Sequence, residues 1–283
     1  MQTRSADFDC ICELVRRHSG VVLEAGKAYL AESRLMLLMR REGLQSLQAL
    51  VVRLRSEPYN GLHQEVVEAM TTHETSFFRD NHPFEALQKN VLPELLAARS
   101  SERRLNIWCA ACSSGQEPYS IAIIIREHFP MLAGWHVTLL ATDFSKQMLE
   151  RAREGRYPQA HVNRGLAPGL LSKYFHKTGT EWRVNDDIRR MVDFRDVNIA
   201  EAWPALPRMD IVLMRNVLIY FELETRRAIL SRAHSLLEPH GFLFLGSAES
   251  TINLSDSFEC VLFDKATCYR PCKQQNAVGH APE

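Results

Sequence analysis

A loop of small residues stands where the sequence could hold a nucleotide-like ligand. The apolar run Arg104–Ala110 ends at this loop, residues 111–115, and Pro118 lies in the first turn of the helix expected next. A strand, a small-residue turn and a helix form the crevice that binds cofactors in parallel sheets. The loop lacks the Gly-x-Gly-x-x-Gly spacing that seats a pyrophosphate on a helix N-terminus. A cofactor without phosphates is therefore favoured, and S-adenosylmethionine fits.

Two carboxylates stand beside this expected crevice. Asp143 ends the second expected strand, where a carboxylate can accept both hydroxyls of a ribose. Glu117 directly precedes Pro118, so it either caps the helix N-terminus or meets a cationic group of the ligand, such as an ammonium. Position alone does not distinguish these two roles of Glu117.

Polar residues also follow the apolar segment Met209–Met214. Arg215 and Asn216 come directly after it, and Tyr220 follows at a loop-to-helix turn. Open α/β sheets bind ligands at the carboxyl ends of their strands, so this pair would face the ligand. For the segment in isolation, a surface arginine and a packing tyrosine are the favoured interpretation.

The segment Thr72–Arg79 combines a histidine, two aromatic residues and an arginine. Taken alone, it is a linker in which Phe77 and Phe78 pack onto the sheet. A single histidine such as His73 is more often structural than a ligand.

The elements that would position these residues alternate between helix and strand from about residue 84. Helices are expected over Phe84–Ala98 and Pro118–His128, from Ser145, and over Leu223–Leu237; strands are expected over Arg104–Ala110, His136–Thr142, Met209–Met214 and Gly241–Gly246, with a hairpin over Phe258–Arg270. This alternation predicts a doubly wound α/β sheet. Short strands around a turn at 177–180 predict an inserted antiparallel β-subdomain over about 174–197.

Residues 7 to about 70 have the spacing of helices. We therefore expect an all-helical N-terminal domain and linker over residues 1–78 and the sheet domain over 79–272. The polar end, 273–283, is expected to be disordered.

Composition narrows the possible partners and the compartment. Lys plus Arg and Asp plus Glu both total 34, and this balance argues against nucleic acid. No apolar stretch approaches the roughly 18 residues that span a bilayer, and no secretory signal is present, so neither membrane insertion nor export is expected. Seven cysteines without framework spacing indicate the cytoplasm. Cys109 and Cys112 lack the further ligands of a zinc site, so no metal is expected.

Together these segments resemble the chemotaxis receptor glutamate O-methyltransferases, the CheR family. The shared motifs are Thr-x-x-Glu-Thr-x-Phe-Phe-Arg at 71–79, Ala-Ala-Cys-Ser-x-Gly-x-Glu-Pro-Tyr-Ser at 110–120, Ala-Thr-Asp at 141–143, Val-Asn at 197–198, Arg-Asn-Val-Leu-Ile-Tyr-Phe at 215–221 and Phe-Leu-Gly at 244–246. They occur in family order and cover most of residues 71–270. The N-terminal region matches in helical character more than in motif.

The resemblance implies methylation of specific glutamate side chains on the cytoplasmic helical region of chemoreceptors, for chemosensory adaptation. The α/β sheet would then be that of an S-adenosylmethionine-dependent methyltransferase. S-Adenosylmethionine would be the methyl donor, with S-adenosylhomocysteine as product. The glutamate carboxylate is already ionised near neutral pH, so no general base is needed. The alternatives are a cofactor-binding regulatory domain that does not methylate receptors, and a methyltransferase for a small molecule or RNA.

The resemblance also implies the site residues. Cofactor contacts fall on His73, Thr75, Arg79, Glu117, Asp143, Asn198, Ile199, Arg215 and Asn216. Asp143 would take the ribose hydroxyls, Glu117 would face the ammonium, and Asn198 with Ile199 would border the adenine. Near the methyl group, Arg79 would orient the incoming carboxylate and Tyr220 would shape the surroundings of the sulfur; these two are the catalytic residues.

Three features modify these expectations. The family often has Asn where this chain has His73, so that contact is open. The loop at 175–183 is shorter than in members that dock on a receptor's C-terminal pentapeptide, so independence from that tether is expected. The N-terminal helices carry an arginine set, Arg34, Arg40, Arg41, Arg53 and Arg55, that either meets the acidic receptor or is a solvated helix face.

Overall fold

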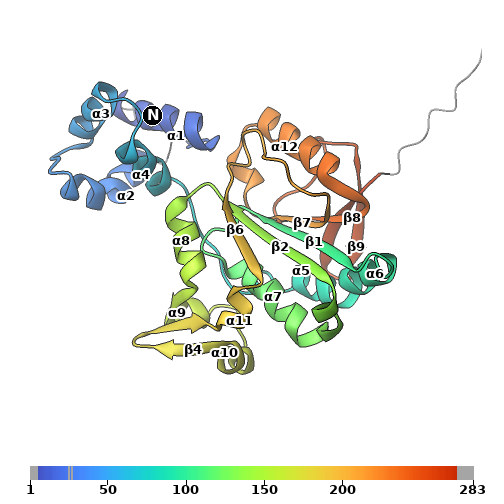
Figure 1. Ribbon diagram of the computed structural model, residues 1–283. Coiled ribbons are helices and arrows are strands. Elements are labelled where there is room, and N and C mark those ends of the chain that lie inside the picture. Colours follow the sequence, from blue (N-terminus) through green and yellow to red (C-terminus); the bar gives the residue numbers. More distant parts are fainter. Residues whose placement is uncertain (1–5, 25, 27, 273–283) are drawn as a thin grey trace, which may run out of the picture.

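The structure is a computed structural model that describes residues 6–24, 26 and 28–272 of the 283-residue chain. Its centre is a seven-stranded sheet in the order β6-β2-β1-β7-β8-β10-β9 (Figure 1). The strands are β1 (Arg104–Ala110), β2 (His136–Asp143), β6 (Val192–Asp196), β7 (Met209–Met214), β8 (Leu237–Leu245), β9 (Phe258–Phe263) and β10 (Ala266–Pro271). Strands β6, β2, β1, β7 and β8 pair in parallel, and β10 pairs antiparallel to β8 and β9. The expected methyltransferase-type α/β fold is confirmed.

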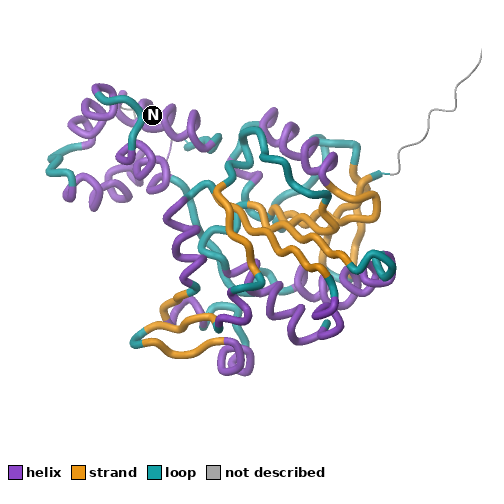
Figure 2. The backbone as a smooth tube through the Cα atoms, viewed as in Figure 1, coloured by secondary structure: helices purple, strands orange, loops and turns teal. Residues whose placement is uncertain are grey.

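Helices cover both faces of this sheet (Figure 2). The flanking helices are α5 (His82–Ala86), the π-helical turn η2 (Leu87–Val91), α6 (Leu92–Ala98), α7 (Gln116–His128), α8 (Lys146–Glu154) and α12 (Leu223–Leu236). Alternate residues of β1 enter opposite cores: Ile107 packs with α5–α7, and Trp108 packs with α12 and the N-terminal helices. This two-residue alternation explains why a continuous apolar run forms a strand buried on both faces.

The N-terminal helices form a separate lobe beside the sheet (Figure 1). They are α1 (Ala6–Ser19), α2 (Ala28–Arg41), α3 (Leu47–Ser56) and α4 (Gly61–Met70). The Ser46 side chain accepts the N–H of Ala49 at the start of α3, and Asn60 accepts those of Leu62 and His63 at the start of α4. These caps satisfy N–H groups that have no partner inside a helix, which explains where the two helices begin.

The small antiparallel sheet differs from the sequence prediction. Its order is β3-β5-β4, from β3 (Arg156–Pro158), β4 (Phe175–Thr178) and β5 (Glu181–Val184). The short helices that accompany it are α9 (Gln159–Val162), α10 (Pro168–Tyr174) and α11 (Asp186–Arg189); two 3-10 turns lie elsewhere, η3 (Pro130–Gly134) between α7 and β2 and η4 (Leu218–Tyr220) after β7. The segment 192–196, predicted to belong to this subdomain, is instead the edge strand of the main sheet, parallel to β2. A short segment of alternating polar and apolar residues could join either sheet, since only its pairing partner decides to which sheet it belongs. The predicted disordered end, 273–283, lies outside the described residues.

Candidate functional site

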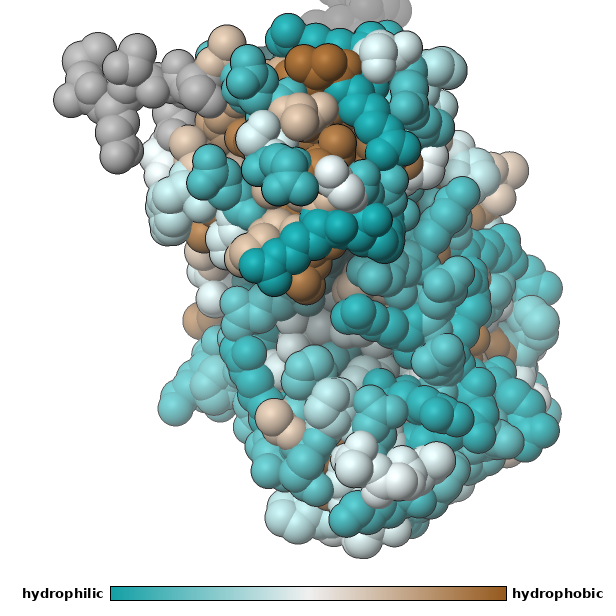
Figure 3. Space-filling view, turned by 90° about the vertical axis from the view of Figure 1, so that its left-hand side faces the viewer, coloured by the Kyte–Doolittle hydropathy of each residue, from teal (hydrophilic) through white to brown (hydrophobic). Residues whose placement is uncertain are grey.

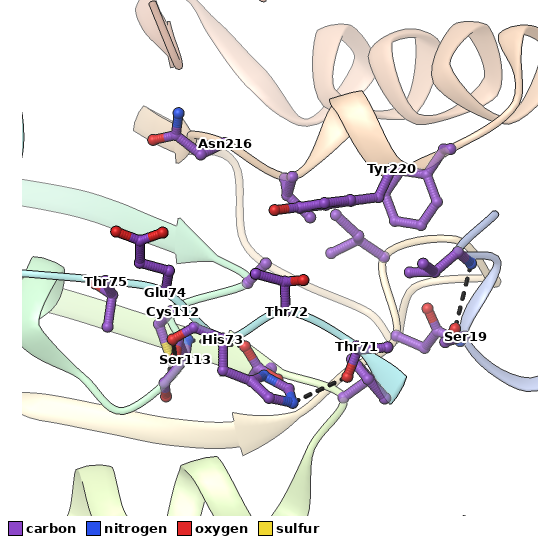
Figure 4. Close-up of a pocket in the computed structure, with 18 of the residues that line it drawn as sticks. Ser19, Thr71, Thr72, His73, Glu74, Thr75, Cys112, Ser113, Asn216 and Tyr220 are labelled. Atoms are coloured by element: carbon purple, nitrogen blue, oxygen red, sulfur yellow. Dashed lines mark hydrogen bonds between the residues drawn. The ribbon is translucent and has the colours of Figure 1, made fainter. Parts of the chain in front are cut away.

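One pocket lies at the carboxyl ends of the parallel strands, beside the N-terminal helices. It encloses about 1200 Å³ when its open mouth is included, which is ample for a drug-sized ligand. The ten predicted site residues all line it: His73, Thr75, Arg79, Glu117, Asp143, Asn198, Ile199, Arg215, Asn216 and Tyr220. Asn216 and Tyr220 lie on one side, and the segment Thr71–Thr75 lies across from them (Figure 4). The structure therefore brings together side chains that are up to 147 residues apart in sequence, from His73 to Tyr220.

The loop after β1 shapes the floor of the pocket. Gly115 has a φ of 92°, and a Cβ placed on it would come 2.9 Å from the Cβ of Ala152. The loop also presents the N–H of Ser113 to the Asp143 carboxylate at 2.8 Å, and the N–H of Ser145 donates to the other oxygen of Asp143 at 2.9 Å. Burial raises the pKa of Asp143, while these N–H groups and His73 oppose the rise.

Glu117 pairs with Arg215 inside the pocket wall. Arg215 Nη1 donates to Glu117 Oε2 at 2.9 Å, and both side chains are largely buried. Burial raises the pKa of Glu117, and the facing guanidinium partly counteracts this. Of the two roles left open for Glu117, this geometry favours a position facing a ligand.

Arg215 is buried, not a surface charge. Besides Glu117, its Nη2 donates to Asp80 Oδ2 at 2.7 Å and to the Arg79 carbonyl at 2.9 Å, while its Nε has no described partner. The isolated-segment interpretation of Arg215 is therefore wrong. The strand end showed where Arg215 starts, but Asp80 and Glu117 come from distant segments, so the sequence did not reveal the burial.

The turn that presents Arg79 is strained. Phe78, Asp80 and Asn81 have φ values of 48°, 66° and 56°, a region that non-glycine residues rarely occupy. The N–H of Phe78 donates to Ser120 Oγ at 3.0 Å, and Arg215 holds Arg79 and Asp80 from the other side. The turn therefore depends on tertiary contacts for its shape.

His73 is oriented by its own segment. Its Nε2 lies 2.9 Å from Thr71 Oγ1 and 3.1 Å from the Glu68 carbonyl, as the dashed line in Figure 4 marks for Thr71. Its carbonyl accepts Ser113 Oγ at 2.9 Å. The backbone of His73 thus ties the linker to the β1 loop, and Thr71 and the Glu68 carbonyl hold its ring at the edge of the pocket.

Asn198 and Ile199 form the wall under the N-terminal helices. Asn198 Nδ2 donates to the His18 carbonyl at 3.1 Å, and Ile199 is buried. Opposite them, Val21 pairs with Phe221 in an isolated bridge, and the N–H of Val22 donates to the Tyr220 carbonyl at 2.8 Å. Residues of the α1–α2 connection also line the pocket, which the sequence did not predict. Helical periodicity reports the core of the lobe, not where the lobe docks.

Glu249 is a second residue that the sequence analysis missed. Its carboxylate accepts backbone N–H groups of the loop that carries Asn216 and Tyr220. It follows the last shared motif by three residues, and a carboxylate just beyond a strand-ending glycine was the available signal.

Further predictions concern the thiols Cys109 and Cys112, metal binding and membrane-spanning helices. Cys109 and Cys112 are fully buried thiols, and burial raises the pKa of each well above its usual range, so neither is a ready thiolate. Within the described residues, no group of three or more His, Cys, Asp or Glu is arranged to hold a metal ion. No described helix combines the length and apolar character needed to cross a membrane.

The chain matches two protein-family models. "CheR methyltransferase, SAM binding domain" matches residues 73–267, and "CheR methyltransferase, all-alpha domain" matches residues 6–71. Chemotaxis protein methyltransferase 1 of Pseudomonas aeruginosa is 43% identical, over 95% of this chain and 99% of its own length. Chemotaxis protein methyltransferase Cher2 of Pseudomonas putida is 40% identical over the same shares, and chemotaxis protein methyltransferase 1 of Vibrio cholerae is 38% identical over 93% and 96%.

Proposed function

The chain belongs to the CheR methyltransferase family and uses S-adenosylmethionine, and we propose that it methylates glutamate side chains of chemoreceptors. The observation that carries the proposal is that the ten predicted site residues line one pocket. Its product would be a glutamate methyl ester.

The polar groups of the pocket fit this cofactor. Glu117 and Asp143 are buried carboxylates, and Asn216 Oδ1 is a buried acceptor without a described partner. Acceptors in such positions favour a ligand that brings hydrogen-bond donors, such as an ammonium and ribose hydroxyls, and they disfavour a phosphate. Each Asp143 oxygen accepts one backbone N–H, so further lone pairs remain for two hydroxyls.

In this proposal each residue of the pocket has a role. Glu117 faces the ammonium of the methionine part, and Asp143 takes the ribose. Asn198 and Ile199 border the adenine. Arg215 keeps Glu117 in place through their 2.9 Å ion pair. The remaining family positions, His73, Thr75, Arg79 and Asn216, complete the enclosure of the cofactor.

The chemistry needs position more than proton transfer. Bound S-adenosylmethionine supplies an activated methyl group on a positively charged sulfur. Arg79 orients the substrate carboxylate toward that methyl, and Tyr220 shapes the surroundings of the sulfur. A glutamate is already ionised near neutral pH, and its negative charge cancels as the new bond forms. A site that excludes water therefore favours the transfer.

The N-terminal helices offer a surface for the receptor. Tyr29, Met36 and Leu37 of α2 are 73%, 41% and 77% exposed, and at helical spacing they share a face with the exposed Arg40. Hydrophobic residues gather on this lobe, whereas the face below it is mostly hydrophilic (Figure 3). An apolar stripe with basic residues suits a glutamate-rich helical bundle in the cytoplasm. We infer that residues 1–78 recognise the receptor and residues 79–272 carry out the transfer.

The structure narrows the predicted arginine set. Arg34 Nη1 donates to the Met70 carbonyl at 2.6 Å and lines the pocket. Arg41 and Arg53 form ion pairs with glutamates of their own lobe. Arg40 and Arg55 are exposed and remain the candidates for direct receptor contact.

Charge reversal at Arg40 and Arg55 should slow receptor methylation about threefold to tenfold, because steering of an acidic partner is lost. Cofactor affinity, measured by calorimetry, should not change. Charge reversal at Arg195, which is exposed on β6, is the matched control. Equal slowing by both changes would show that these arginines of the N-terminal lobe do not recognise the receptor.

We also propose that methylation does not depend on a receptor's C-terminal pentapeptide. Thr178 pairs with Glu181 across the turn between β4 and β5, so this hairpin is closed by a two-residue loop. Such a loop leaves little chain to hold a peptide. Tight binding of the pentapeptide in calorimetry would overturn this proposal.

Transfer of radiolabelled methyl groups to chemoreceptor membranes tests the function. We expect base-labile label on receptor glutamates, located by mass spectrometry, and none on a receptor whose methylated glutamates are replaced by alanine. A regulatory domain without methyltransferase activity would bind S-adenosylmethionine but leave the receptors unlabelled. A small-molecule or RNA methyltransferase would also leave them unlabelled.

A further inference from the structure

Glu249 occupies a concave set of backbone N–H groups next to the pocket. Its Oε2 accepts the N–H of Asn216 at 2.7 Å and that of Gly246 at 2.6 Å. Its Oε1 accepts the N–H of Val217 at 2.9 Å and that of Ile219 at 3.2 Å. One carboxylate thus joins the end of β8 to the loop that follows β7, and charge-assisted bonds of this type are stronger than neutral ones.

The local backbone is shaped around this carboxylate. A Cβ at position 246 would lie 2.7 Å from Glu249 Oε2 and 2.8 Å from the Asn216 nitrogen. Only glycine leaves room for so close an approach. Asn216 itself has a φ of 58°, and this left-handed turn directs the N–H groups of residues 216, 217 and 219 to one point.

The loop held in this way carries two residues of the methyl-transfer site. Asn216 and Tyr220 both line the pocket, on the side opposite Thr71–Thr75 (Figure 4). After Ile219 the loop has other supports: Arg226 Nε donates to the Phe221 carbonyl at 2.7 Å, and Val22 N–H donates to the Tyr220 carbonyl at 2.8 Å. Arg226 Nη2 also donates to the Ile219 carbonyl at 3.2 Å, and Glu249 holds the N–H groups of residues 216, 217 and 219.

We propose that Glu249 is a positioning residue for methyl transfer, which acts by holding the 216–219 loop so that Asn216 and Tyr220 meet the cofactor and substrate. The proposal rests on the function proposed above. Glu249 touches backbone groups and acts through Asn216 and Tyr220. A displacement of about 1 Å at a reacting centre is enough to cost on the order of a hundredfold in rate.

The test compares Glu249→Ala, Glu249→Gln and the control Glu224→Gln in the full-length protein. Glu224 is an 80% exposed residue of α12 whose ion pair with Arg227 lies outside the pocket. For Glu249→Ala we expect kcat for receptor methylation to fall about 10-fold to 100-fold and the Kd of S-adenosylhomocysteine to rise about threefold to tenfold, because Asn216 lines the cofactor pocket, while KM for the receptor stays within about threefold of wild type. Glu249→Gln keeps one acceptor oxygen and should lose less, and Glu224→Gln should match wild type.

Hydrogen exchange separates this role from general destabilisation and from failure of the proposed function. In Glu249→Ala, the amides of residues 216, 217 and 219 should exchange at least about tenfold faster, while those of β1 and β7 stay protected. Local exchange equal to wild type would overturn the proposal, whether or not the wild-type protein methylates receptors. So would a kcat loss that merely follows the unfolded fraction. If the wild-type protein leaves receptors unlabelled but Glu249→Ala still shows faster local exchange, the proposed function is refuted and the loop-holding role of Glu249 is retained.

A double-mutant cycle with Tyr220→Phe adds a second check. If Glu249 acts through Tyr220, the combined loss in kcat should be smaller than the product of the two single losses. Fully multiplicative losses would contradict a route through Tyr220 and leave Asn216 as the only residue through which Glu249 could act.

Discussion

A buried arginine lies near each end of strand β7, Arg99 at its start and Arg215 just after its end. The two differ in whether all their nitrogens have hydrogen-bond acceptors. At the start of β7, Asp210 is fully buried and receives Arg99 Nε at 2.8 Å and the N–H of Asn106 at 2.8 Å. The other nitrogens of Arg99 donate to Glu102 and Glu238. Every guanidinium nitrogen of Arg99 therefore has an acceptor within the protein.

The other end of β7 is less complete. Arg215 Nε and Asn216 Oδ1 have no described partner, and the adjoining turn contains three strained residues, Phe78, Asp80 and Asn81. Buried polar groups are normally paired, and exceptions call for an explanation. The saturated end stabilises the fold, and the open end retains bonding capacity for a ligand. Changes at the two ends should accordingly separate stability from activity.

The largest effect is expected at the saturated end. Asp210→Asn removes the charge facing Arg99 and should lower the free energy of unfolding by about 3 kcal/mol, because a buried ion would lose its partner. Chemical denaturation measures this, and the folded fraction should bind S-adenosylhomocysteine as wild type does. Asp187→Asn, from an exposed pair with Arg126, is the control and should cost less than about 0.5 kcal/mol. If Asp210→Asn lowered the free energy of unfolding no more than the control does, the two ends of β7 would not differ in their contribution to stability.

At the open end, Arg79→Ala should lower kcat about 100-fold, close to 2.7 kcal/mol of activation free energy. The free energy of unfolding should stay within about 0.5 kcal/mol of wild type, because the partly exposed side chain of Arg79 makes one bond within the described residues, to the Glu74 carbonyl, and contributes little to the fold. Steady-state methylation and calorimetry with S-adenosylhomocysteine provide the two measurements, and Arg195→Ala is the control. Full turnover together with normal cofactor binding would show that Arg79 does not orient the carboxylate.

A smaller loss is expected from Asp80→Asn, about tenfold in kcat. Arg215 would lose a charged partner at 2.7 Å, and the strained turn that carries Arg79 would relax. Glu94→Gln changes a 44% exposed carboxylate of α6 that pairs with Arg270, away from the strained turn, and should leave kcat unchanged. If Asp80→Asn lowered stability and left kcat unchanged, the open end would resemble the saturated one.

The smallest effect near neutral pH concerns the buried carboxylates. Burial raises the pKa of Glu117 and Asp143, so both take up protons at a higher pH when the protein is folded than when it is unfolded. Their contribution to stability therefore falls as pH rises from the ordinary carboxyl range through the raised folded pKa, and is constant above it. Affinity for the cofactor should change in the opposite direction and weaken as pH falls through that window. Calorimetric titration across pH would show this, and Glu117→Gln should flatten the profile; an unchanged profile would separate Glu117 from the pH dependence.

Much of this arrangement was predictable from local sequence. Strands β1 and β7 were predicted with the bounds that the structure has, and the β2 and α8 predictions agree closely. An apolar run buried on both faces and the Ser145 cap are local signals, so no partner is needed to recognise them. The same signals placed Asp143, Arg215 and Asn216 at the carboxyl edge of the sheet.

What sequence could not supply depends on pairing between distant segments. The edge strand β6 was assigned to the wrong sheet because its pattern does not name its partner. Arg215 could not be placed inside the protein without Asp80 and Glu117. Glu249 binds backbone N–H groups, which every residue type except proline has. The sequence therefore does not indicate which residues Glu249 contacts.

The contact between the α1–α2 connection and the loop after β7 limits how such proteins can be recombined. Val21 bridges Phe221, and Gly20 lies so close to Ala200 that an added Cβ would come within 2.5 Å of the Ala200 Cβ. A chimaera that exchanged α1–α4 between relatives would replace residues that line the cofactor pocket with those of the other protein. Receptor preference should therefore transfer cleanly only when residues 19–23 stay with the recipient, which makes this short segment the natural junction for grafting.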